Sequence, residues 1–126
     1  MPTPPGFLPG QHLIDSFGAG GFRFADMSHR GSILALPSGV SAWAAMAPGD
    51  ITAESLAALF AEPDGSIELL IVGTGADLVP LAPALREKLR AAKIRFDPMA
   101  TRVAISTYNI LLGERRRVAA ALLAVD

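Results

Sequence analysis

The hydrophobic positions of the chain change their period near its middle. In the first part, short apolar segments alternate with turn residues. These segments are residues 12–17, 21–26, 32–37 and 40–44. Phe22 and Phe24 stand two residues apart and therefore share one face of a strand. Short strands separated by frequent turns, with one turn at "HRG" (29–31), predict an antiparallel meander.

After Thr52 the pattern becomes one of helices that alternate with buried strands. Thr52 is predicted to cap a helix over residues 53–60, because its hydroxyl can accept a free N–H of the first turn. The run "IELLIVG" at 67–73 is almost continuously apolar. Such a run fits a strand that is buried on both faces, as in parallel sheets.

A second helix and a second strand are predicted after this run. Leu81, Leu85 and Leu89 repeat at i, i+4 and i+8, which predicts the buried face of a helix. Residues 93–98, "KIRFDP", are predicted to form the following strand. A strand, a helix and a strand at this spacing make a βαβ unit.

The last segment predicts a third helix and a third parallel strand. Thr101 is predicted to cap a helix over residues 102–112, with Gly113 as the left-handed residue that ends it. The alanines of residues 116–125 favour helix by intrinsic propensity. Their position after a helix and a tight turn favours a strand instead, and we predict a strand there. The fold class is therefore α/β, with N-terminal antiparallel strands followed by a C-terminal βαβαβ unit.

Composition narrows the class of protein. With 126 residues the chain is expected to form a single domain over 11–126, preceded by a flexible, proline-rich arm over 1–10. The net charge of −1 argues against nucleic acid as a partner. The absence of cysteine excludes disulfides and thiolate chemistry. No signal peptide and no run of 18 apolar residues is recognisable, so we predict a soluble, cytoplasmic protein without a transmembrane segment.

The turn Gly73-Thr74-Gly75 is the main candidate for a binding site. Successive N–H groups between a strand and a helix can cradle a phosphate, and Thr74 adds a hydroxyl. The alternative is a tight bend that needs glycine for its backbone angles. The dinucleotide pattern Gly-x-Gly-x-x-Gly is incomplete, because Leu78 occupies the third glycine position. Asn109 either contacts a neighbouring loop or lines a polar cleft shared with this turn.

The remaining polar residues form no complete catalytic set. His12 and His29 are the only histidines and lie far apart, so we expect no metal site and no cofactor. Trp43, the single tryptophan, belongs either to the core or to the surface that binds a partner. Arg116 and Arg117 are candidates for the same partner surface, or are part of a solvated turn.

Several strings resemble a known domain family. "ELLIVGTGAD" at 68–77 and "GFRF" at 21–24 contribute, and the most specific string is "TYN" at 107–109, followed by Glu114 and then arginine. The chain resembles the short bacterial members of the Mth-type domain family. That family includes the mitochondrial complex I assembly factor 3 proteins and the adipogenesis-associated Mth-domain proteins.

The resemblance implies a fold and a class of function. It implies a central mixed sheet with helices on both sides, and a non-catalytic interaction or assembly module whose protein partners are subunits of a respiratory complex. The rival hypothesis from the residues is a small-molecule or anion-binding protein, or an enzyme, that uses the Gly73–Gly75 turn. We therefore lean against catalysis but leave both hypotheses open. The sequence makes no prediction of the oligomeric state.

Overall fold

The computed structural model describes residues 7–126. Along the chain its elements are β1 (Phe7–Pro9), β2 (Ser16–Gly18), β3 (Gly21–Phe24), β4 (Met27–Arg30), β5 (Ser32–Leu36), β6 (Gly39–Trp43), the 3-10 turn η1 (Pro48–Asp50), α1 (Ala57–Phe60), β7 (Leu69–Gly73), α2 (Pro83–Ala91), β8 (Arg95–Met99), α3 (Thr101–Gly113) and β9 (Val118–Leu122). The arm predicted for residues 1–10 falls outside the described residues over 1–6. Residues 7–9 of the predicted arm instead form β1, which pairs antiparallel with β6.

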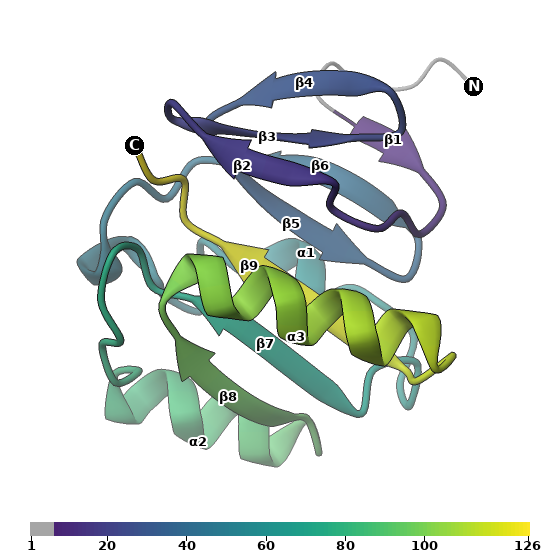
Figure 1. The fold of residues 1–126 in the computed structure, drawn as a ribbon. Coiled ribbons are helices and arrows are strands. Elements are labelled where there is room, and N and C mark those ends of the chain that lie inside the picture. Colours follow the sequence, from purple (N-terminus) through teal and green to yellow (C-terminus); the bar gives the residue numbers. More distant parts are fainter. Residues whose placement is uncertain (1–6) are drawn as a thin grey trace.

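A mixed sheet of six strands organises the molecule, in the order β1-β6-β5-β9-β7-β8 (Figure 1). β7 is parallel to both of its neighbours: Leu70 pairs with Phe96 of β8 and with Ala119 of β9. β9 is antiparallel to β5 on its other side. The predicted α/β class is confirmed. The buried strand predicted over 67–73 is present as Leu69–Gly73, and the strand predicted within 116–125 is β9.

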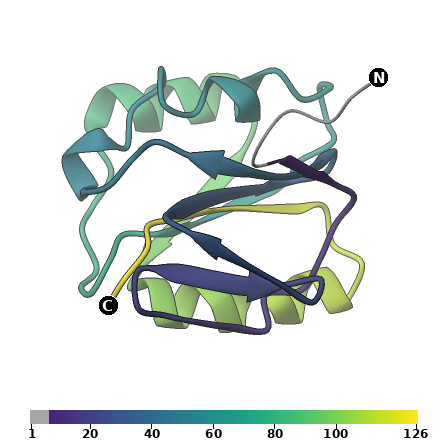
Figure 2. The same cartoon turned by 90° about the horizontal axis from the view of Figure 1, so that it is seen from above.

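Helices cover both faces of this sheet (Figure 2). Successive residues of a strand point to opposite faces, so each strand feeds two separate cores. Leu70 and Val72 of β7 pack with α1 and α2, whereas Ile71 packs with α3. The predicted apolar face is confirmed for Leu85 and Leu89, which are the buried residues of α2. Leu81 is buried as well but lies before the helix, which starts at Pro83, where the missing N–H is harmless.

The N-terminal strands divide between two sheets rather than forming one meander. β2, β3 and β4 make a separate three-stranded antiparallel sheet, which lies next to α3 and buries Phe22 and Phe24. Of the turn predicted at residues 29–31, only a bend at Gly31 is present, with φ of 96°, because His29 and Arg30 belong to β4. The chain reverses earlier, at Ala25 and Asp26. Both have positive φ, as the turns that suit a two-residue hairpin require.

The helix ends differ from the predictions in three places. The hydroxyl of Thr52 does accept the N–H of Ser55 at 3.1 Å, but the regular helix α1 begins only at Ala57. Thr101 is the first residue of α3 rather than its cap. Gly113 remains helical, and the left-handed residue is Arg115, with φ of 61°.

Candidate functional site

The turn after β7 lies at the carboxyl edge of the parallel strands, where α/β sheets usually bind ligands. Glycine is needed at its first position. A Cβ on Gly73 would lie 2.9 Å from Oγ1 of Thr101 and 3.0 Å from the side chain of Leu122, both too close. Gly75 has φ of 101°, a conformation that side chains disfavour. The local sequence therefore follows from the tight geometry of the turn.

The polar groups of the turn are used inside the protein. The Thr74 side chain is 2% exposed, and its hydroxyl donates to the carbonyl of Asp77 at 2.6 Å and accepts the N–H of Val79 at 3.0 Å. The N–H of Thr74 donates to the carbonyl of Met99 at 2.8 Å. The N–H of Gly75 donates to Oγ1 of Thr101 at 3.0 Å. A phosphate at Thr74 or Gly75 would have to displace these bonds.

Thr101 is the buried centre of this network. Its hydroxyl donates to the carbonyl of Leu123 at 2.8 Å and accepts from Gly75, and its N–H donates to the carbonyl of Gly75 at 2.8 Å. The side chain is fully buried. One hydroxyl thus joins the turn after β7, the start of α3 and the residue after β9. Sequence reasoning missed this role, because the partners are distant along the chain.

A hollow of about 520 Å³ lies beside the turn. It is lined by the outer side of the turn, by Met46 and Val79, and by the last residues of the chain. Its ionisable side chains are the carboxylates of Asp77 and Asp126. Two carboxylates repel an anion, so the charge of the hollow does not favour a phosphate.

Asn109 is engaged elsewhere. Its side-chain amide donates to the carbonyl of Ile14 at 2.8 Å and accepts the N–H of Ile14 at 2.9 Å, which mimics a pair of strand hydrogen bonds. Asn109 lies two turns of α3 beyond Thr101, or roughly 12 Å along the helix axis. The structure therefore brings Asn109 to the segment before β2 and not to the glycine turn.

Tyr108, next to Asn109, is fully buried against the sheet. Its hydroxyl oxygen is enclosed and has no hydrogen-bond partner within residues 7–126. Burial disfavours the charged phenolate and raises the pKa of Tyr108 to about 12. This tyrosine fills the core and is not placed to bind a ligand.

Trp43 is a core residue rather than a surface anchor. Its side chain is 5% exposed and packs with the apolar residues on the α1 and α2 side of the sheet. Its indole N–H donates to the carbonyl of Ser55 at 2.9 Å. The hypothesis that Trp43 contacts a partner is therefore wrong, since its polar atom is satisfied and its ring is enclosed.

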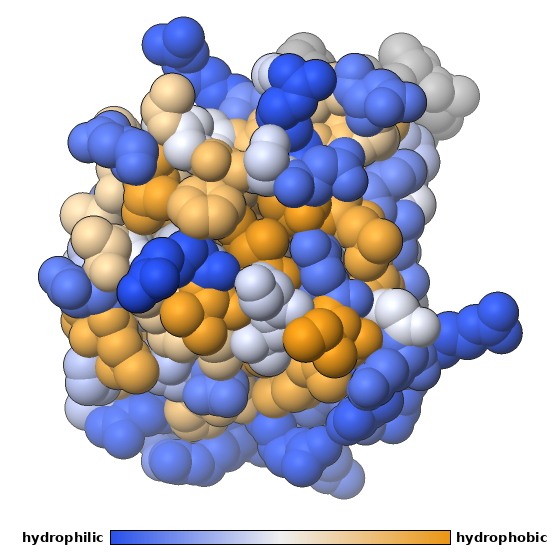
Figure 3. Space-filling model, in the orientation of Figure 1, coloured by the Kyte–Doolittle hydropathy of each residue, from blue (hydrophilic) through white to orange (hydrophobic). Residues whose placement is uncertain are grey.

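An exposed apolar surface lies on the α3 side of the six-stranded sheet, opposite the side on which Trp43 packs. Val103 and Ile110 stand on the outer side of α3 and are 46% and 62% exposed. Leu13 and Phe17, from the segment that pairs with Asn109 and from β2, are 50% and 42% exposed. Figure 3 shows apolar side chains gathered over α3 and towards β2 on this face. We call these four residues the α3 patch.

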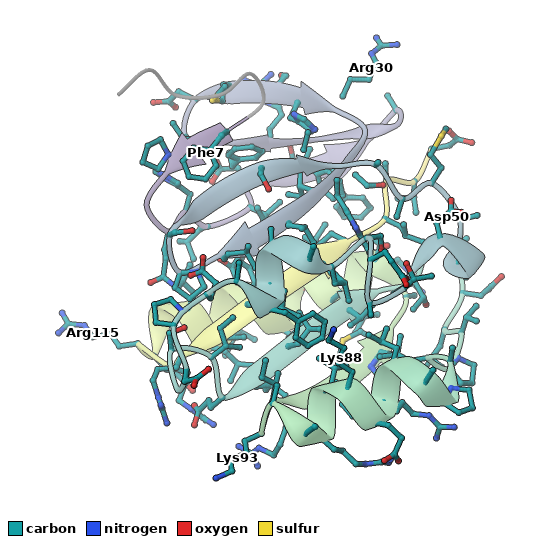
Figure 4. The ribbon with its side chains drawn as sticks, turned by 180° about the vertical axis from the view of Figure 1, so that it is seen from behind. Phe7, Arg30, Asp50, Lys88, Lys93 and Arg115 are labelled. Carbon is teal, nitrogen blue, oxygen red and sulfur yellow. The ribbon has the colours of Figure 1, made fainter. Side chains whose placement is uncertain are left out.

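Arg116 and Arg117 are exposed, and both pair with the carboxylate of Glu68. Nε of Arg116 donates to Glu68 at 2.6 Å, and a guanidinium nitrogen of Arg117 lies 3.7 Å from the other oxygen of Glu68. The hydrogen bond from Arg116 lowers the pKa of Glu68. Figure 4 shows Arg115 extending away from the protein after α3.

Within residues 7–126, no three acidic or histidine side chains converge in a way that could hold a metal ion. Over the same residues, no helix has the length and apolar character needed to cross a membrane.

The sequence model of a protein family matches residues 14–123, almost the whole chain. The description of this family is "Protein of unknown function (DUF498/DUF598)". The chain belongs to this family. The Mth-type resemblance predicted from the sequence is confirmed, because a Bordetella pertussis protein described as a Mth938-like domain matches this chain with a TM-score of 0.73. That protein is 30% identical, and the match covers 89% of this chain and 85% of the other.

Other relatives define the range of the family. An uncharacterized protein of Rhodobacter capsulatus is 40% identical over 122 residues, which are 97% of this chain and 91% of that one. The NADH dehydrogenase [ubiquinone] 1 alpha subcomplex assembly factor 3 of Danio rerio is 33% identical over 111 residues, 88% of this chain. The match covers 63% of that assembly factor, so the chain spans less than two thirds of its length.

A solved structure agrees with the fold in detail. The crystal structure described as an outer membrane protein from Bartonella henselae matches with a TM-score of 0.90 and 46% identity. The match covers 94% of this chain and 98% of that one. The predicted family resemblance and the predicted arrangement of a mixed sheet between helices are thus both confirmed.

Proposed function

We propose that this protein is a non-catalytic assembly module that binds a protein partner during assembly of respiratory complex I. The observation that carries the proposal is the 33% identity to assembly factor 3 over 111 residues. The match covers most of this chain, so the proposal concerns its folded domain.

The chemistry of the candidate site supports binding over catalysis. The hydroxyls of Thr74 and Thr101 hold the fold together, and the Asn109 amide holds the segment before β2. Each of these groups already has its partners within the protein. Reactive groups in enzymes need access to a substrate, which these groups lack.

We place the partner on the α3 patch. The inner face of α3 is buried, yet Val103 and Ile110 point outward, and Phe17 extends the apolar area towards β2. Apolar side chains that cluster on the surface of a domain commonly mark a protein interface. Arg116 and Arg117, which follow α3, would then lie near the edge of the contact, where charges guide encounter more than affinity.

The test is complementation of a deletion in the source organism. We expect the deletion strain to accumulate incompletely assembled NADH:ubiquinone oxidoreductase, and the wild-type gene to restore assembly. The double variant Val103→Asp/Ile110→Asp should fail, although it folds. The matched control is Ala84→Asp, which adds a carboxylate to an exposed position of α2 on the other side of the sheet. Normal assembly in the deletion strain would refute the proposed function.

A second candidate function rests on the hollow beside the Gly73–Gly75 turn. Its volume of about 520 Å³ falls in the range of small-molecule sites, roughly 300–1,000 Å³. Its carboxylates favour a neutral or cationic ligand over an anion. Thermal-shift measurement with phosphate, nucleotides and polyamines tests it, because a ligand at 100 times its Kd adds about 2.7 kcal/mol. A hollow that responds to none of them is not a binding site for these ligands.

We also propose a cytoplasmic location, which the cysteine-free composition supports. The Bartonella henselae relative is described as an outer membrane protein, so the outer membrane is the alternative location. Cell fractionation with an antibody against the protein distinguishes the two: recovery in the outer-membrane fraction would overturn our proposal.

A further inference from the structure

The three-stranded sheet carries a hollow that the proposed function does not use. It measures about 500 Å³ and is lined by residues of β2, β3 and β4. The strand register shows which face it occupies. Arg23 stands between Ser16 and Ser28, and two residues along, Gly21 stands between Gly18 and Arg30. These six residues share the face opposite the buried Phe22 and Phe24, and all six line the hollow.

Glycine keeps the centre of this face open. Gly18 and Gly21 are directly opposite each other, so no side chain covers the backbone between the strands. Gly21 cannot be replaced without movement, because a Cβ there would collide with the carbonyl oxygen of His29. The ring of His29 packs towards Phe24 on the inner side, with the centroids 6.5 Å apart. Main-chain atoms of the strands therefore form the bottom of the hollow, and side chains surround it.

The charged side chains that line the hollow are guanidinium groups, and no Asp or Glu lines it. Arg23 donates one hydrogen bond, to Oγ of Ser28 at 3.0 Å. Within residues 7–126, neither Arg23 nor Arg30 forms a salt bridge, whereas Arg90, Arg116 and Arg117 all do. Figure 4 shows Arg30 reaching out from the sheet, clear of other side chains. Both guanidinium groups are free to bind an anion.

We propose that this hollow binds the phosphate group of a phosphorylated ligand. Guanidinium groups pair with phosphate oxygens through two parallel N–H donors, and two arginines on one face can converge on the same phosphate. The hydroxyls of Ser16 and Ser28 stand on either side of Arg23 and add donors.

Two kinds of ligand present this chemistry: a soluble phosphate ester and the headgroup of an anionic lipid. Separate binding measurements distinguish these sources. The first titrates the purified protein with ADP and with pyrophosphate by calorimetry. The second measures cosedimentation with phosphatidylcholine vesicles, with and without phosphatidylglycerol, at the same ionic strength.

The variants are Arg23→Gln, Arg30→Gln and their combination, with Arg102→Gln as the control. Arg102 is an exposed arginine of α3 that does not line the hollow, so its replacement removes the same charge elsewhere. We expect saturable binding in at least one measurement. Each single variant should weaken it about tenfold, as loss of a charge-assisted hydrogen bond does, and the combination should abolish it. Unchanged melting temperatures would show that the variants remain folded.

The proposal is overturned if no probe binds saturably, or if Arg102→Gln weakens binding as much as Arg23→Gln. The second result would mean a response to net charge. Binding by soluble phosphates alone or by vesicles alone supports the site and identifies the source. The double variant of the α3 patch should bind these probes normally, so failure of the assembly proposal would leave this one standing.

Discussion

Replacing Thr101 with valine keeps the shape of a fully buried side chain and removes its hydroxyl. The change deprives the N–H of Gly75 of its acceptor at 3.0 Å and the carbonyl of Leu123 of its donor at 2.8 Å. A buried polar group left without a partner costs about 1–3 kcal/mol. Gly75 is partly exposed and water can reach it, so we expect a total loss of about 2–4 kcal/mol in the free energy of unfolding.

Unfolding in urea is the assay, followed by the fluorescence of Trp43. This is the only tryptophan in the chain, and its side chain is 5% exposed, so its emission reports the loss of the core. In a domain of this size, the predicted loss lowers Tm by about 10 °C. Thr101→Ser is the matched control, because it retains the hydroxyl and removes only a methyl group, for about 1 kcal/mol.

The order of the two variants decides the result. If the hydroxyl acts through its hydrogen bonds, valine destabilises the protein more than serine does. Equal losses, or a larger loss for serine, would mean that Thr101 contributes through its methyl group, and the account of the turn would be wrong. Hydrogen exchange at the amide of Gly75 gives an independent check: protection in the wild type should be lost in the valine variant.

Three further predictions follow from buried or strained positions. The free energy of unfolding should fall between pH 10 and pH 12, because the unfolded chain ionises Tyr108 while the folded protein keeps it protonated. In the Tyr108→Phe variant this pH-dependent loss of stability should be smaller by about 2–3 kcal/mol, as measured by urea unfolding across that range. Gly113→Ala should raise the stability by about 0.5–1 kcal/mol, since the added Cβ would meet open space within α3. Arg115→Gly should also raise the stability, because glycine tolerates the positive φ at this position. A lower Tm for either variant would contradict the helix end described above. Leu85→Ala should lower the stability by about 2–5 kcal/mol and the exposed Lys88→Ala by less than about 1 kcal/mol, and similar losses would mean that the buried face of α2 is misassigned.

The second half of the chain was predictable because its signals are local. From Leu69 to Gly73 the run has no polar residue, so a strand buried on both faces suits it. Leu85 and Leu89, at helical spacing, identify the inner face of α2. The alanines of β9 show the limit of propensity: they favour helix, and the position between two sheet neighbours overrides that preference.

The corrections arise where distant contacts decide the local structure. Thr101 looks like a helix cap, but its hydroxyl is already bonded to the residue after β9, so the cap position falls to Ala100. The pairing of Asn109 with Ile14 joins residues 95 positions apart, and no local pattern encodes it. The pairing of β1 with β6 and the separation of β2–β4 into their own sheet have the same cause.

Among the candidate site residues, the sequence identified the glycine turn and its two interpretations. It could not choose between them, because the choice depends on whether the N–H groups find partners inside the protein. Trp43 presented the same difficulty, since a large aromatic side chain suits a core and an interface equally well. The basic hollow on β2–β4 escaped notice because only strand pairing puts Arg23 and Arg30 on one face.

The position of β9 has a consequence for biosynthesis. It lies between β5, from the first half of the chain, and β7, from the second half, yet it is made after both. Until residues 118–122 leave the ribosome, the nascent chain holds two incomplete sheets with bare edges on β5 and β7. Bare edges pair readily with other chains. A premature stop codon just before Val118 would therefore leave two unjoined pieces that aggregate, although it removes few residues.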